Sequence, residues 1–192
     1  MRKRWIAMLL AAAMSVAAQA QDVAEVFLKM PDAQLVLLNA ASRKALVDMQ
    51  RAGEKAQVAN EMGGSAEIWK MTDAYLWVET SEGMFIEIRR LPLVNHTYVV
   101  CLVTTVEVPM QAQDSRVEFF TTDWTPLPAE GMYRPATMTD FLRADADTTS
   151  EDLREIRAAA DMNLFRYLLS ADGPTLSVIY RTPKYFNKAL QE

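Results

Sequence analysis

Cysteine and histidine are almost absent from this sequence of 192 residues, which contains one of each. A single cysteine, Cys101, cannot form a disulfide within the chain, so the fold must rely on a packed core. Cys101 lies five residues after His96 in one apolar segment, where a strand would rise about 3.3 Å per residue. The two side chains would then lie far apart on opposite faces, which excludes a thiol–imidazole catalytic pair. We predict that Cys101 is a buried, unreactive core residue.

Motifs of common enzymes are also missing. The sequence has no G-x-S-x-G nucleophile elbow, and the lone His96 restricts any catalytic triad. Acidic residues on predicted strands could serve a hydrolase of glycans or peptides as a carboxylate pair. The candidates are Glu79, Glu87, Glu118 and Asp123. Strand alternation places most of them on a solvent face, so a hydrolase is the alternative rather than the leading hypothesis.

One acidic cluster suggests a calcium site. Its members are Asp145, Asp147, Glu151 and Asp152. In a calcium loop that begins at Asp145, Ser150 would occupy the position that requires glycine, and Ile156 the position of the final glutamate. We therefore interpret the cluster as a solvated helix start and predict no metal and no other cofactor.

No apolar run in the chain is long enough to cross a membrane. The first twenty residues instead have the three parts of a secretory signal: a basic start at 2–4, an apolar stretch over 5–16 and the cleavage site Ala18-Gln19-Ala20. We expect cleavage after Ala20 and export to the periplasm or the medium. Residues 21–192 would then form a single α+β domain.

The charge balance argues against a nucleic-acid partner. The predicted leader (residues 1–20) holds three of the 20 basic residues and no acidic residue, so the mature chain would carry 17 basic against 25 acidic residues. An excess of acidic side chains repels phosphate backbones and anionic lipid.

The strongest structural signal lies in residues 95–128. Two segments rich in β-branched and aromatic residues flank a polar turn at 110–115, which predicts two long antiparallel strands. Residues 98–103 are apolar on both faces of the first strand. We therefore place this strand centrally in a sheet that is covered on both sides.

The rest of the chain predicts helices around a meander of strands. Helices are expected over 23–30, over 43–52 with Asn39 or Ser42 as cap, over 138–144 with Thr137 or Thr139 as cap, and from a capping box at Thr148 or Thr149 to about residue 160. Further strands are expected at 65–71, 74–80, 84–91, 163–170 and 175–181, and a loop at 54–64. The predicted fold class is α+β: an antiparallel β meander of about seven strands with helices packed on one face.

Three phrases resemble a known family: EVFLKMPD at 25–32, FFTTDWTPLP at 119–128 and YRTPKYF at 180–186. Together they are similar to the DUF3256 family of exported Bacteroidales proteins of unknown function, over essentially the whole mature chain. The resemblance implies a Gram-negative envelope or secreted setting and no known catalytic residue. In that setting Asp147-Thr148-Thr149 looks like an O-glycosylation acceptor, and whether Thr148 is glycosylated stays open.

Aromatic residues near predicted strand ends supply the candidate functional surface. They are Trp124, Tyr133, Tyr185 and Phe186. Aromatic side chains are enriched at binding surfaces, although the same residues could plug the edges of the core. The leading hypothesis is an exported, non-enzymatic binding or accessory module whose partner is an envelope protein or a glycan. The sequence leaves the oligomeric state open.

Overall fold

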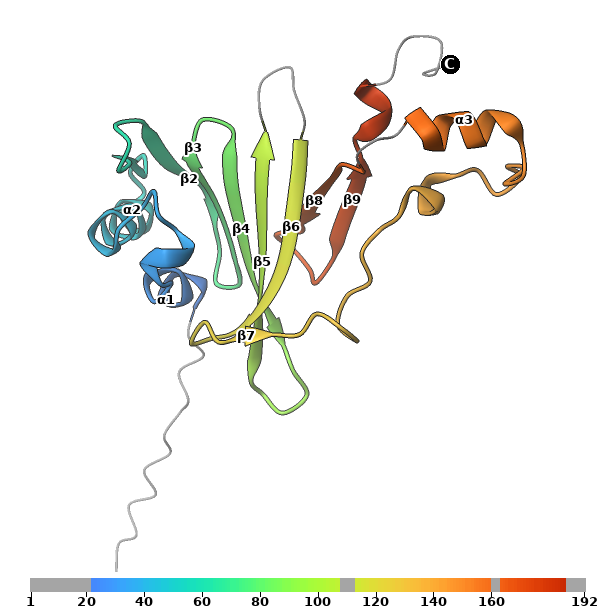
Figure 1. Cartoon of the computed structure of the whole chain (residues 1–192). Helices are drawn as coiled ribbons and strands as arrows, with labels where there is room; N and C mark the ends of the chain where they lie inside the picture. The colour runs from blue at the N-terminus through green and yellow to red at the C-terminus, as the bar shows by residue number, and fades with distance from the viewer. Residues whose placement is uncertain (1–21, 108–112, 160–162, 186–192) are drawn as a thin grey trace, which may run out of the picture.

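The computed structural model describes residues 22–107, 113–159 and 163–185 (Figure 1). In chain order the elements are α1 (Val23–Leu28), η1 (Asp32–Gln34), α2 (Ala40–Ala52), β1 (Gln57–Ala59), β2 (Ser65–Met71), β3 (Tyr75–Ser81), β4 (Met84–Pro92), β5 (Tyr98–Glu107), β6 (Gln113–Thr121), β7 (Pro126–Leu127), η2 (Met138–Phe141), α3 (Glu151–Ala159), β8 (Phe165–Leu169), β9 (Leu176–Tyr180) and η3 (Thr182–Tyr185). Strands β1 to β7 form one antiparallel sheet in sequence order, and β8 and β9 form a separate hairpin. The predicted class, an α+β antiparallel meander, is confirmed.

The interior position of β5 follows from its side chains. β5 pairs with β4 over nine residue pairs and with β6 over nine more. Val100 and Leu102 point to one face of the sheet, and Val99, Cys101 and Val103 point to the other. All five are buried, so both faces of the sheet must be covered.

Helices α1 and α2 cover the first face (Figure 1). Asn39 caps α2 by accepting a hydrogen bond from the Ser42 N–H at 2.9 Å, and Gly53 ends it in the left-handed conformation with φ of 74°. Val47 and Leu46 are fully buried from this helix. The predicted helix over 43–52 therefore exists and begins three residues earlier.

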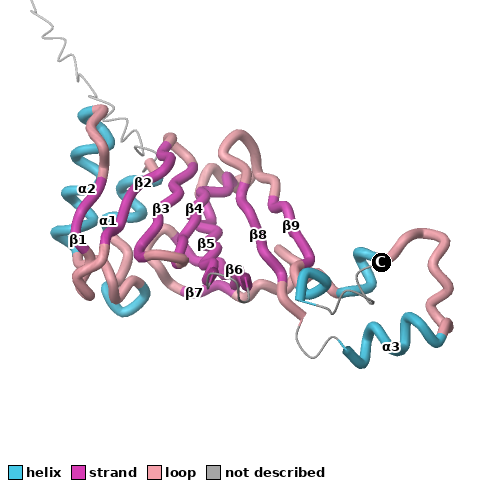
Figure 2. Tube along the Cα trace, turned by 90° about the horizontal axis from the view of Figure 1, so that it is seen from above, coloured by secondary structure: helices cyan, strands magenta, loops and turns pink. Residues whose placement is uncertain are grey.

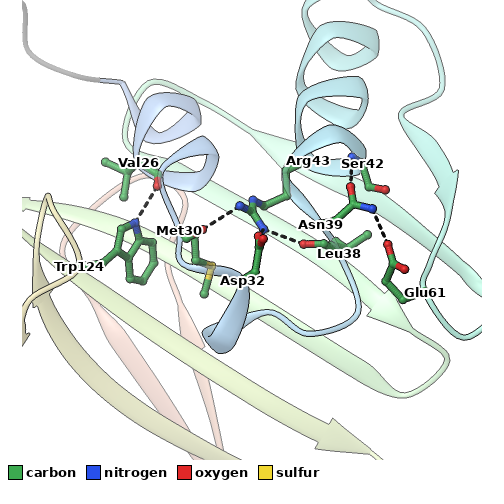
Figure 3. A network of polar contacts seen from close by, with 9 residues as sticks. All are labelled: Val26, Met30, Asp32, Leu38, Asn39, Ser42, Arg43, Glu61 and Trp124. Atoms are coloured by element: carbon green, nitrogen blue, oxygen red, sulfur yellow. Dashed lines mark hydrogen bonds and ion pairs between the residues drawn. The ribbon is translucent and has the colours of Figure 1, made fainter.

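A buried arginine joins the two helices. The guanidinium of Arg43, on α2, donates to the Met30 carbonyl at 2.8 Å, to the Leu38 carbonyl at 2.6 Å and to Asp32 at 2.8 Å (Figure 3). Two of these acceptors are backbone groups of the segment between α1 and α2. Arg43 thus satisfies carbonyl oxygens that neither helix can pair by itself.

The β8–β9 hairpin covers the opposite face (Figure 2). Phe165, Tyr167 and Leu169 of β8 are buried against Cys101 and Val103 of β5 and their neighbours. The backbone of β8 is also bonded to the sheet. Its N–H groups at these three positions donate to Asp114, Ser115 and Glu87 at 3.2, 3.1 and 3.0 Å, respectively.

Several local predictions need correction. The loop predicted at 54–64 contains the short strand β1. The two final strands form a separate hairpin instead of extending the meander, and the sheet reaches seven strands through β1 and β7. The helix predicted at 138–144 is the 3₁₀ turn η2. The residue that caps α3 is Ser150, whose hydroxyl accepts from the Leu153 N–H at 3.2 Å, and not Thr148 or Thr149. In the described ranges no helix is long and apolar enough to span a bilayer.

Truncation of a β5 core residue should cost much of the stability of the domain. Leu102 is 3% exposed, so Leu102→Ala should lower the free energy of unfolding by about 2–5 kcal/mol. Urea denaturation of the mature chain measures this change. Leu93→Ala is the matched control because Leu93 is 44% exposed, and it should change stability by less than about 1 kcal/mol. Equal losses in the two variants would contradict the central position of β5.

Candidate functional site

One hollow of the described residues lies beside β9 of the β8–β9 hairpin. It is a pocket of about 470 Å³ between η2, α3, β9 and the start of η3. The lining side chains are almost all apolar: Met138, Phe141, Leu142, Leu153, Ile156, Val178, Ile179, Tyr180 and Pro183. Small-molecule and peptide side-chain sites have this size and character.

Stacked aromatic rings hold one wall of the pocket. Phe141 from η2 stacks on Tyr180 of β9 with ring centroids 5.5 Å apart and on Phe165 of β8 at 5.9 Å. Phe165 and Tyr180 are themselves 5.1 Å apart. The Tyr180 hydroxyl donates to the Asn163 amide oxygen at 3.3 Å, which restricts the orientation of this ring. Ring stacking and this hydrogen bond together hold the Tyr180 side of the pocket in place.

Helix α3 supplies the opposite wall. Leu153 is buried and Ile156 is half-buried, three residues apart on one face of the helix. Across the pocket, Ile179 is 41% exposed and Phe141 is 39% exposed. Apolar side chains of this size left open to solvent beside a concave surface are typical of a binding site.

A second hollow of about 410 Å³ adjoins this pocket. The two share Met138, and the second is also lined by Arg157, Thr137 and Asn163. Arg157 is exposed, and no carboxylate of the described residues forms an ion pair with it. The combined surface thus offers an apolar floor with a cation at one side.

The predicted aromatic surface is not assembled in one place. Trp124 is 4% exposed and lies in the core against α1, where its indole N–H donates to the Val26 carbonyl at 2.8 Å (Figure 3). Its backbone has a φ of 63°, a conformation that costs a bulky residue about 1–2 kcal/mol. Burial of the ring and the indole hydrogen bond offset that cost. Trp124 therefore belongs to the core and cannot contribute to an exposed surface.

Of the other three aromatic candidates, the structure describes the side chain of Tyr133 alone. Tyr133 is half-buried and packs on Phe119 at 6.2 Å and edge-on to Tyr167 at 5.7 Å, and burial raises the pKa of its hydroxyl. Tyr133 therefore supports the hairpin layer. Phe186 and the side chain of Tyr185 lie outside the described residues.

The four acidic candidates for hydrolysis do not converge. Glu79 accepts from the indole of Trp69 at 3.1 Å, Glu118 pairs with Arg116, and Asp123 is exposed in the turn after β6. Glu87 is 5% exposed and accepts from the Tyr75 hydroxyl at 2.8 Å as well as from the Leu169 N–H. Among the described residues no hydrogen bond joins any two of them.

Glu87 is a structural carboxylate below the hairpin. Burial raises its pKa above the usual 4.5, although the hydrogen bonds from Tyr75 and Leu169 and the charge of Arg166 oppose the shift. Its position was missed because alternation assigned it to a solvent face. The strand that covers it lies about eighty residues later in the sequence.

The other residues singled out in the sequence lie at separate places in the fold. Cys101 is buried, and burial raises the pKa of its thiol to about 12, with a further contribution from the charge of Glu87. His96 lies in the turn before β5, with a φ of 63°. Within the described ranges no group of three or more histidine, cysteine or acidic side chains is placed to hold a metal. Asp147 accepts from the Thr149 hydroxyl at 2.6 Å and from the Thr149 N–H at 2.8 Å, and these hydrogen bonds lower the pKa of its carboxyl.

Glu87 should make stability depend on pH. A carboxyl group with a raised pKa in the folded state binds its proton more tightly there than in the unfolded chain. The free energy of unfolding should therefore fall as pH rises from about 4.5 through the folded-state pKa. Glu87→Gln keeps an acceptor for Tyr75 and Leu169 without the charge, so denaturation measured from pH 4 to 7 should show a smaller fall. Glu118→Gln removes a half-buried carboxyl of β6 that pairs with Arg116, and it should leave the wild-type slope unchanged. An unchanged slope in Glu87→Gln would contradict the assignment.

Comparisons with known proteins agree with this architecture. A comparison with curated proteins found no match. Among solved structures, the chain is similar to a domain of an uncharacterized protein from Porphyromonas gingivalis W83, with a TM-score of 0.77 and 25% sequence identity over 88% of this chain and 86% of that chain. The model of the family described as "Protein of unknown function (DUF3256)" matches residues 15–192. The chain belongs to the DUF3256 family.

Proposed function

We propose that this protein is an exported, non-enzymatic binding module of the bacterial envelope, and that its ligand site is the apolar pocket between α3 and β9. The observation that carries the proposal is that the apolar side chains of Ile179 and Phe141 are exposed in the lining of a hollow of about 470 Å³. Burial of such side chains by a ligand contributes roughly 25 cal/mol per Å² of apolar area. The supporting walls of this pocket are α3 and the aromatic stack.

The chemistry of the pocket favours binding over catalysis. Among the described residues, its lining includes no carboxylate, histidine or cysteine. The carboxylate with a raised pKa, Glu87, lies below the hairpin and is engaged by Tyr75 and Leu169, so a substrate in the pocket would not reach it. An apolar pocket without acid–base groups is suited to holding a side chain or a small apolar group.

Export rests on the tripartite leader of residues 1–20. Mass spectrometry of the protein recovered from cell envelope or medium should place its first residue at Gln21. The expected change is the loss of a basic, apolar segment that the signal peptidase removes. Recovery of exported protein with Met1 intact would contradict this part of the proposal.

The pocket can be tested with a small amphipathic probe. The dye 8-anilinonaphthalene-1-sulfonate has aromatic rings for the apolar floor and a sulfonate for the side of Arg157. We expect saturable binding at one site on the mature protein, measured by fluorescence. Ile179→Lys places a charge in the floor and should weaken this binding about tenfold or more, because the ligand would then desolvate an unpaired ammonium group.

The control variant inserts the same charge elsewhere. Val36 is 74% exposed and lies in the segment between α1 and α2, so Val36→Lys should leave dye binding unchanged. Thermal unfolding of both variants should stay close to that of the wild type, since both positions are exposed. Dye binding that is unaltered in Ile179→Lys, or absent in the wild type, would reject the pocket as the ligand site.

A further inference from the structure

Building on the proposed function, we infer that the ligand is an extended peptide segment of another protein, which adds as a strand to the outer edge of β9. Its apolar side chains would enter the pocket between β9 and α3, and an acidic group of the same peptide would pair with Arg157. Three independent features support this peptide: unpaired backbone groups, the adjoining apolar pocket and the complementary charge.

The backbone groups follow from the register of the hairpin. Arg181 N–H donates to the Leu164 carbonyl at 2.8 Å, and Ser170 N–H donates to the Thr175 carbonyl at 2.9 Å. Hydrogen-bonded pairs alternate along an antiparallel ladder, so residues 177 and 179 of β9 face β8. The N–H and C=O groups of Leu176, Val178 and Tyr180 therefore point outward, and among the described residues none of them has a hydrogen-bond partner.

The two edges of the hairpin differ in this respect. The corresponding N–H groups of β8 are satisfied by Asp114, Ser115 and Glu87 of the large sheet. β9 lies on the side of the hairpin away from the sheet (Figure 2). Of the two hairpin edges, the β9 edge is therefore the one whose N–H groups lack partners in the described ranges.

The β9 edge is also without the usual protection. The edge strands of the large sheet are short, with three residues in β1 and two in β7. β9 has five residues, LSVIY, with neither a charged residue nor a proline to discourage pairing. An edge of this length spans about 16 Å and can pair with a peptide of about five residues.

The pocket adjoins that edge. Val178, Ile179 and Tyr180 line it directly, and Leu153 and Ile156 of α3 face them across the hollow. Side chains of an added strand alternate between the two faces of the sheet, so every second residue of the peptide can enter an apolar hollow. This combination of main-chain pairing and side-chain pockets is the physical basis of β-strand addition.

Charge complementarity limits the sequence of the peptide. Arg157 lines the adjoining hollow with no ion-pair partner in the described ranges. A carboxylate on the bound peptide would supply one. A neutral second copy of the β9 strand, pairing edge to edge, offers no such group because β9 contains no acidic residue.

The test starts from a library of random twelve-residue peptides displayed on phage and selected on the mature protein. Selected peptides are synthesised, and their affinities are measured by fluorescence polarisation. We expect sequences with alternating β-branched or aromatic residues and at least one acidic residue. A selection that yields no peptide binding above an unrelated control protein would overturn the inference.

Backbone pairing is tested on both partners. Val178→Pro removes an outward-pointing N–H without removing a bond to β8, and should weaken peptide binding at least tenfold. Val178→Thr changes the same pocket-lining side chain but keeps the N–H, so its loss of affinity should be clearly smaller than that of the proline variant. In case the proline variant does not fold, two N-methylated forms of one peptide are measured on the wild-type protein. Methylation of one alternate set of amides should abolish binding, and methylation of the other set should not. Equal affinities of the two methylated peptides would overturn strand addition.

Two further experiments test the charge pairing at Arg157 and the possibility of self-association. Arg157→Gln should weaken acidic peptides about tenfold, whereas Arg154→Gln on the same helix should not, because Arg154 is paired with Glu151. If size-exclusion chromatography shows a wild-type dimer that Val178→Pro converts to a monomer, the occupant of the edge is a second copy and the peptide inference fails. Binding of the anilinonaphthalene dye that survives in Val178→Thr while no peptide binds would reject the peptide alone and leave the pocket as the ligand site.

Discussion

A central strand that is apolar on both faces requires a cover on each side, and that constraint governs this fold. β5 buries Val100 and Leu102 toward α1 and α2, and Cys101 and Val103 toward β8. The two helices that cover the first face directly precede the strands of the sheet in the chain. The second face is covered by a hairpin from the far end of the sequence, so its core closes only when residues 165–180 return to the sheet.

The thinness of that second cover produces the candidate site. A two-stranded hairpin has an outer face and an outer edge of its own. The sheet below can neither bury that face nor form hydrogen bonds with that edge. The chain places η2 and α3 beside the hairpin and leaves a hollow between them instead of a packed interface. The two strands of the hairpin therefore differ: β8 completes the core with its inner side, and β9 borders the pocket that we propose as the ligand site.

Much of the fold could be predicted from sequence because its signals are local. Asn39 and Gly53 mark the ends of α2, and residues 98–103 identify a strand buried on both faces. Long-range burial was not predictable. Strand alternation predicts a solvent-exposed Glu87, but the structure buries this side chain and bonds it to Tyr75 and Leu169. Trp124 lies near a strand end, where exposure is expected, but its indole is buried and donates to the Val26 carbonyl. The pocket was missed for the same reason: Leu153, Ile156 and β9 were recognised separately, and nothing local shows that they face one another.

The bonds between β8 and the sheet also determine where the chain can change length. Asp114, Ser115 and Glu87 meet N–H groups at every second residue of β8, and a shift of one residue would turn all three donors to the opposite edge of the strand. A single insertion within 165–169 would therefore lose the hydrogen bonds and the buried side chains together. Insertions at 171–174, in the turn between β8 and β9, leave that spacing intact. Natural variation in length should accordingly concentrate in the hairpin turn and be absent from the strand, which makes β8 the least permissive part of the second layer.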